Sequence, residues 1–231
     1  QCILTSPEKQ QIFDILADRK KKTIVEYLKK FPNLDAVKYF VMDMNHVYLG
    51  ICKELFPNAK PVADRFHYTR CCTEAVEAVR KRVQDSLSSK ARKRFKKSRK
   101  LLLKKDCKLS PEERVAVEAL LAHSEDLARA WLLKEDFYRF LQSKDSDEAK
   151  RKLDQFCHSA KKLQLPEFEP LLKTLKNWEP YILNSFDCLY SNGFTEGTNN
   201  SIKVLKRVTY GMPNFRNFRA RILHCCSKVV P

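Results

Sequence analysis

Residues 37–67 read VKYFVMDMNHVYLGICKELFPNAKPVADRFH, and this stretch decides the fold class. Residues 37–42 form a nearly continuous apolar run, which is typical of a strand buried on both faces in a parallel sheet. A helix over about 46–55 follows, and residues 60–63 form a second short apolar run. Because strand, helix and strand alternate, the stretch predicts an α/β core with two parallel strands.

The segments before this stretch extend the core. Apolar runs at 1–6 and 10–16 flank a turn that contains Pro7, which indicates a β-hairpin. Residues 19–31 place their apolar side chains on one helical face, and Pro32 ends the helix.

Residues 68–190 contain no glycine and no clear strand, so they predict an all-helical insertion. Apolar residues from Val76 to Leu102 recur mostly at intervals of three and four, which predicts one long helix with polar Ser98 on its apolar line. Further helices are expected at about 111–122, 125–142, 146–163 and 167–184. Their expected core consists of Trp131, Phe137, Phe140, Phe156 and Trp178.

The chain then returns to the core through SNGFTEGTNNSIKVLKRVTYG at 191–211, with a final helix over about 214–226. The expected organisation is therefore an N-terminal core part at 1–67, a helical insertion at 68–190 and a core return at 191–231.

The charge balance points to a polyanionic partner. Lys and Arg number 45 against 28 Asp and Glu, which gives +17 at pH 7. Nucleic acid is the simplest such partner, and a membrane surface is the weaker alternative. No apolar run reaches the roughly 18–20 residues of a spanning helix, and no signal peptide opens the chain, so we expect a cytoplasmic, nucleoid-associated protein.

The nine cysteines form no C-x-x-C motif and predict free thiols in a reducing compartment, mostly as small buried hydrophobes. A zinc site remains the minor alternative, because six potential ligands occur in two groups. These are His67, Cys71, Cys72, His224, Cys225 and Cys226.

Two acids directly follow the predicted parallel strands. Asp43 ends the first and Asp64 the second, and functional sites of open α/β sheets gather at these strand ends. The structural alternatives stay open: Asp43 or Asn45 could cap the next helix, and Asp64 could cap a helix or pair with Arg65. His67 could equally be a satisfied structural histidine.

A third acid, Glu196, lies at the start of a basic helix. On a helix Asn199, Asn200, Lys203 and Arg207 share its face, at i+3, i+4, i+7 and i+11. Two amides and two cations behind a carboxylate suit a phosphodiester held beside a metal ion, since helix starts favour phosphate oxygens. The structural alternative is an acid that stabilises the helix start.

Together the acids fit metal-dependent phosphoryl transfer. Two Mg²⁺ ions can activate an attacking oxygen and stabilise the leaving one, and hard cations prefer carboxylate oxygens. Asp43 and Glu196 could supply two ligands, and a third is expected from a neighbouring strand.

The sequence resembles the ISL-three family of bacterial insertion-sequence transposases, members of the DDE class. The resemblance rests on residues 41–68, 191–211 and 214–223, with 17–32 also fitting. It implies a ribonuclease H-like fold in which Glu196 is the final acid of the triad. It implies Asp43 as the second acid, with Asp64 as the other candidate, and a D-x-x-H motif in which Asp64 and His67 support the site.

The resemblance also implies partners and cofactors: transposon-end and target DNA, Mg²⁺ with Mn²⁺ as substitute, and a homo-oligomer when the enzyme is complete. The residues expected to bind DNA are Arg65, Arg92, Lys96, Arg99, Asn199, Asn200, Lys203, Lys206 and Arg207. For the basic run at 90–105, a solvated helix face without a ligand stays open as the alternative.

The first acid of the triad would lie just before residue 1, together with the family's zinc-binding and helix-turn-helix segments. We therefore expect a ribonuclease H-like core without its first strand, in a fragment that lacks a complete metal site and does not cleave and transfer DNA strands by itself. The alternative is a non-catalytic DNA-binding remnant or a domesticated copy. A structural RNA-binding helical protein is a third and more distant reading.

Overall fold

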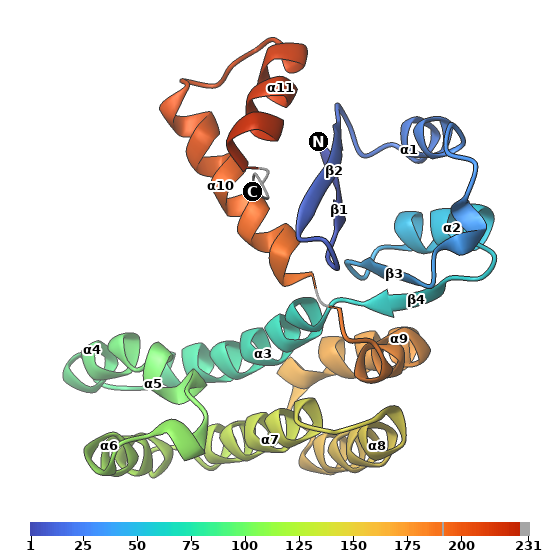
Figure 1. Ribbon diagram of the computed structural model, residues 1–231. Coiled ribbons are helices and arrows are strands. Elements are labelled where there is room, and N and C mark those ends of the chain that lie inside the picture. The colour runs from blue at the N-terminus through green and yellow to red at the C-terminus, as the bar shows by residue number, and fades with distance from the viewer. Residues whose placement is uncertain (191, 227–231) are drawn as a thin grey trace. The chain divides into compact units, whose positions relative to one another are not determined.

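The computed structural model describes residues 1–190 and 192–226, except for the side chains of Lys90 and Arg94. It divides into two compact units (Figure 1). The core unit comprises Gln1–Arg65 and Cys188–Pro231, and the helical unit comprises Phe66–Asp187. Ser191, the first residue of the expected core return, lies outside the described residues.

The predicted hairpin is confirmed. Strand β1 (Cys2–Ser6) pairs antiparallel with β2 (Gln11–Leu16), with an irregularity in register between Leu4 and Thr5. Gln10, the last residue of the turn, has φ 49, in the left-handed region that tight turns use.

The predicted strand–helix–strand stretch is also confirmed. Strand β3 (Tyr39–Met42) runs parallel to β4 (Lys60–Ala63), and helix α2 (His46–Leu55) connects them. Burial of β3 on both faces was wrong: Met42 is buried, whereas the other residues of the strand are half-buried. The reason is the small size of the sheet, since within the described residues β3 pairs with β4 alone.

The helices of the core unit pack on its strands through two hydrophobic clusters. Helix α1 (Lys21–Leu28) packs with α2 on the hairpin. The short turn η1 (Leu34–Ala36) connects α1 to β3 along the chain. Helices α10 (Gly193–Val208) and α11 (Phe215–Cys226) pack on the other cluster. Its buried members are Ile12, Ile15, Ile202, Phe218 and Ile222.

The single long helix predicted before residue 103 was wrong. It is divided into α3 (Arg65–Asp85), α4 (Ser89–Lys97) and α5 (Arg99–Leu103). Serines lie at both breaks, and their hydroxyl groups donate to nearby backbone carbonyls: Ser86 to Val83 and Ser98 to Phe95. Such bonds compete with helical backbone pairing, which explains the interruptions.

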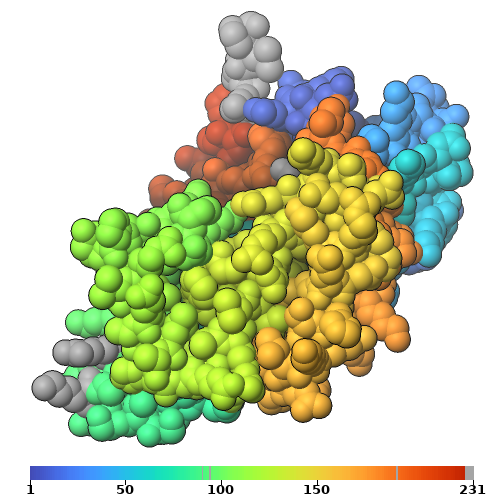
Figure 2. Space-filling model, turned by 90° about the horizontal axis from the view of Figure 1, so that it is seen from below, coloured from blue at the N-terminus to red at the C-terminus, as the bar shows by residue number. Residues whose placement is uncertain are grey.

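The later helices of this unit agree with the prediction. They are α6 (Pro111–Leu121), α7 (Glu125–Leu141), α8 (Ser146–Leu163) and α9 (Glu169–Asp187), with short turns η2 (Asp106–Lys108) and η3 (Pro166–Phe168). Ser110 and Glu113 form a reciprocal capping box at the start of α6. Helices α6 to α8 form one continuous face of the unit (Figure 2).

Aromatic rings fill the core of the helical unit. Phe137 contacts Phe140 and Phe156 with ring centroids 5.4 and 5.1 Å apart, as predicted, whereas Trp131 is only half-buried. The buried hydroxyl groups of Tyr68 on α3 and Ser185 on α9 lie 2.9 Å apart. The first and last helices of the insertion are therefore bonded to each other.

Within the described residues, each helix is too short or too polar to cross a bilayer.

Candidate metal and nucleic-acid site

The two strand-end acids lie side by side because β3 and β4 end level. Met42 pairs with Ala63, and the backbone N–H of Asp64 donates to the Met42 carbonyl at 2.9 Å. Asp43 and Asp64 are the next residues along their strands. Asp64 is 3% exposed, so it is largely shielded from water, whereas Asp43 is half-buried.

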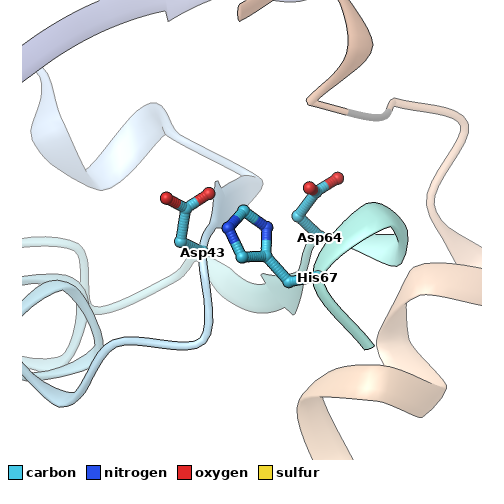
Figure 3. A group of neighbouring side chains, drawn as sticks. All are labelled: Asp43, Asp64 and His67. Atoms are coloured by element: carbon cyan, nitrogen blue, oxygen red, sulfur yellow. The ribbon is translucent and has the colours of Figure 1, made fainter. Parts of the chain in front are cut away.

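His67 joins these two carboxylates. It lies in the first turn of α3, three residues after Asp64, and the imidazole lies between Asp43 and Asp64 in Figure 3. One potential ligand atom from each of the three side chains lies within 4.8 Å of the other two. We call these three residues the acid–histidine group.

The role of Asp43 as a helix cap is excluded. Asn45 caps α2, because its side-chain oxygen accepts a hydrogen bond from the Val47 backbone N–H at 2.8 Å. The Asp43 carboxylate instead accepts a hydrogen bond from the side-chain amide of Asn192 at 3.2 Å.

Asn192 is the N-cap residue of α10, so this hydrogen bond joins Asp43 to the start of the helix that carries Glu196. A second contact fixes the same turn, since the hydroxyl groups of Thr195 and Thr5 lie 2.7 Å apart. Glu196 is half-buried in this first turn, and its backbone N–H donates to the Asn192 carbonyl. Within the described part of the chain, Glu196 is not a member of the acid–histidine group.

The predicted DNA-binding residues of α10 line its outer face. Thr195, Thr198 and Ile202 are buried against the core unit. Asn199 is half-buried, whereas the residues that follow on this face are exposed: Asn200, Lys203, Lys206 and Arg207.

Two of the predicted DNA-binding residues of the helical unit, Arg92 and Arg99, have acid partners. Arg92 forms an ion pair with Asp85 at 2.7 Å, and Arg99 lies 3.9 Å from Glu77. Lys96 is exposed, and Arg65 is half-buried at the start of α3. The side chain of Arg94, in the same basic run, lies outside the described residues.

The cysteines do not assemble a zinc site in the described residues, where His67 groups with carboxylates instead. Several cysteines are buried, as expected, but Cys107 and Cys225 are exposed. For those two, the expectation of burial was wrong, because Cys107 lies in a surface turn and Cys225 on the outer face of α11.

Two features of the core unit were not predicted from the sequence. One is Asn192, whose amide reaches Asp43 across 149 residues of sequence. The other is a buried cluster in which Asp14 accepts hydrogen bonds from Arg219 Nε at 2.6 Å and from the Tyr27 hydroxyl group at 2.5 Å. An acid within the apolar strand QIFDIL was the available signal for this cluster, since a buried acid requires partners.

The cluster perturbs the pKa values of its members. Burial and the hydrogen bond to Asp14 raise the pKa of Tyr27 to about 12. Burial opposes ionisation of Asp14, but the bonds from Arg219, Tyr27 and the Ile15 backbone outweigh it and lower the pKa of the carboxyl group. The carboxylate therefore stays ionised and ties α1 and α11 to β2.

The donor set of the acid–histidine group fits a divalent cation. Two carboxylates supply the oxygen ligands that Mg²⁺ and Mn²⁺ prefer, and the imidazole adds a nitrogen ligand.

Comparison with known proteins identifies the class. Residues 1–222 match a family model described as "Transposase". The chain therefore belongs to the ISL-three family of DDE transposases, as the sequence motifs indicated.

Curated relatives agree with this membership. The chain is 27% identical over 195 residues to a protein of Mycobacterium tuberculosis named transposase for insertion sequence element IS1557, covering 74% of the chain and 43% of the relative. It is 24% identical over 225 residues to the IS1001 transposase of Bordetella parapertussis, covering 95% of the chain and 55% of the relative.

A Lactococcus lactis protein named ATP-dependent protease is 35% identical over 108 residues, which cover 46% of the chain and 33% of that protein. The chain thus spans between a third and about half the length of these relatives. No solved structure shows a significant match.

Proposed function

We propose that this chain forms the catalytic core of a DDE transposase, with a ribonuclease H-like arrangement that cleaves DNA strands and joins them to a target. One observation carries the proposal. Asp43, Asp64 and His67 converge within 4.8 Å at the ends of adjacent parallel strands, and the helix bearing Glu196 begins with a hydrogen bond to Asp43.

Each acid has a distinct role in this proposal. Asp43 and Glu196 act as the second and final acids of the triad, and Asp64 is the further metal ligand. A divalent cation held by these carboxylates would supply positive charge to the reacting phosphate and acidify a bound water. His67 supports the metal site or contacts DNA near the scissile phosphate, and the Asn192 amide orients the Asp43 carboxylate.

The outer face of α10 holds the DNA backbone. Lys203, Lys206 and Arg207 supply positive charge, and Asn199 and Asn200 supply amide donors beside the acids. Contacts to phosphates position the strand and make binding depend on salt, but they read no sequence. Transposon ends and target DNA are the proposed partners, and assembly into a homo-oligomer in the cytoplasm belongs to the same proposal.

A second candidate is a protein that binds DNA without cleaving it. Glu196 lies outside the acid–histidine group in the described residues, whereas the basic face of α10 is present in full. The two candidates differ in one property, since only the catalytic core needs a functional metal site.

The metal site can be tested directly on this chain by titrating Mn²⁺ and following its electron paramagnetic resonance signal. We expect Asp43→Asn and Asp64→Asn to weaken binding at least tenfold. Asp35→Asn, which removes an exposed acid elsewhere in the core unit, is the matched control and should leave binding unchanged. Equal Mn²⁺ affinity in the wild-type and Asp43→Asn proteins would refute the metal site.

The triad is tested in a polypeptide as long as the curated relatives. In such a protein, Asp43→Ala or Glu196→Ala should abolish Mg²⁺-dependent strand cleavage and leave DNA binding largely intact. Normal cleavage by either variant would remove that residue from the triad. Cleavage lost together with DNA binding would show a structural defect instead.

A further inference from the structure

The turn between α10 and α11 presents an aromatic ring to solvent. Tyr210 is 99% exposed, next to Val208 at 69%. A large ring in water without packing partners gains nothing for the fold, because burial is what makes an aromatic side chain stabilising.

The backbone at this turn is also unfavourable for tyrosine. Tyr210 has φ 50, and Gly211 and Met212 follow with φ 103 and 28, so three successive residues lie in the left-handed region. That region costs a residue with a Cβ atom about 1–2 kcal/mol, and glycine or asparagine is the ordinary choice. Neither local conformation nor packing therefore explains a tyrosine at this position.

The turn is nevertheless well defined by hydrogen bonds. The Gly211 N–H donates to the Lys206 carbonyl at 3.0 Å, and the Tyr210 N–H donates to the Arg207 carbonyl at 3.2 Å. The Thr209 hydroxyl group also donates to the Leu205 carbonyl at 2.9 Å. These bonds fix the backbone that carries the ring, so a ligand would meet a preorganised surface.

The charge around the ring selects the ligand. Residues 197–226 contain six cations and no acid. Arg219 pairs with Asp14, whereas within the described part of the chain no ion pair involves the other five. These exposed cations are Lys203, Lys206, Arg207, Arg216 and Arg221.

From this combination we propose that Tyr210 stacks on an unpaired base of a DNA strand whose phosphates are held by the neighbouring cations. Exposed aromatic rings among cations are the means by which proteins bind single strands, because every base has a π face. A duplex keeps its bases stacked on each other, so it would use the cations and leave the ring without a role. The inference rests on the proposed function for its ligand, DNA, and adds the unpaired base.

The test compares two DNA ligands by fluorescence anisotropy: a blunt duplex and the same duplex with a short single-stranded tail. Tyr210→Ala should weaken binding of the tailed DNA by about 5- to 150-fold and change duplex binding by less than about twofold. Tyr210→Phe should bind both like the wild type, because it retains the ring. Both variants keep a Cβ atom in the same backbone conformation, so the strain is matched.

Two controls separate stacking from other effects. Val208→Ala shortens an exposed apolar side chain without a π face, and it should bind tailed DNA normally. A 2-aminopurine placed in the tail should lose fluorescence on binding to the wild type and to Tyr210→Phe, but not to Tyr210→Ala.

Several results would overturn the inference. Equal losses on both DNA ligands, an equal loss in Val208→Ala, or a Tyr210→Ala protein that binds tailed DNA normally would each exclude stacking. Loss of self-association in Tyr210→Ala, with unchanged DNA binding, would assign the ring to a contact between copies of the chain. If the wild-type chain bound neither DNA ligand, the DNA-binding function itself would fail as well.

Discussion

Replacing Asp14 with asparagine tests how helices α1 and α11 are held on strand β2 of the core unit. The carboxylate of this buried residue on β2 accepts hydrogen bonds from Arg219 on α11, from Tyr27 on α1 and from the backbone N–H of Ile15. Asp14→Asn keeps the size of the side chain, removes the charge and turns an NH₂ group toward one of the donors.

The expected loss is about 2–3 kcal/mol. A hydrogen bond to a charged group contributes about 1.5–3 kcal/mol, and asparagine keeps one acceptor oxygen. The side chain of Arg219 is 42% exposed, so water weakens that pair and lowers the total. The same substitution at Asp85, whose ion pair with Arg92 is exposed, should cost at most about 1 kcal/mol.

The pH dependence follows from the lowered pKa of Asp14. A carboxyl group whose pKa in the folded protein is lower than its ordinary 3.8 stabilises the fold above that value, and this stabilisation is lost as the pH falls through the folded pKa. The difference between wild type and Asp14→Asn should therefore be constant from about pH 8 to 5 and shrink below about pH 4.

Urea unfolding followed by circular dichroism measures the loss, and hydrogen exchange of peptides from β2, α1 and α11 locates it. Faster exchange should be concentrated in these three elements. If Asp14→Asn cost no more than Asp85→Asn, or if exchange increased elsewhere instead, the cluster would not be what holds α11 on the hairpin.

Three further predictions concern charge, capping and a buried cation. The double substitution Lys203→Ala with Arg207→Ala should reduce the slope of log K against log salt for duplex DNA by about 2, and an unchanged slope would exclude phosphate contacts. Ser110→Ala should lower the free energy of unfolding in urea by about 1 kcal/mol through loss of the capping box, and a neutral result would show that the box is dispensable. Lys134→Met should lower the free energy of unfolding by about 3 kcal/mol, because the fully buried amine pairs with Glu135 and donates to two backbone carbonyls. Tryptophan fluorescence reports the unfolding transition, since the amine lies over the Trp131 ring. A variant as stable as the wild type would refute the estimate.

Local patterns predicted most of the elements. The helix His46–Leu55 and the strand Lys60–Ala63 have the predicted bounds, because apolar periodicity and the flanking Pro and Asn residues mark their ends. The adjacency of Asp43 and Asp64 was also accessible, since parallel strands end at the same sheet edge.

The features that sequence patterns did not predict depend on long-range contacts or on side chains that compete with backbone hydrogen bonds. The break at Ser98 arises from a hydroxyl group that competes with the helix, which apolar spacing does not register. The bonds from Asn192 to Asp43 and from Arg219 to Asp14 join residues 149 and 205 positions apart, and no local pattern encodes such pairs. Lys134 is a charged residue in a helix of mixed polarity, so the sequence pattern did not predict its complete burial.

The helical insertion sets an order of events during synthesis. Asp43 leaves the ribosome 149 residues before Asn192, a delay of about 7–30 s at 5–20 residues per second. The bond between Tyr68 and Ser185 lets the insertion close on itself before α10 emerges. A nascent chain therefore carries the Asp43 carboxylate without its Asn192 partner for many seconds, until the residues that follow the helical insertion have been synthesised.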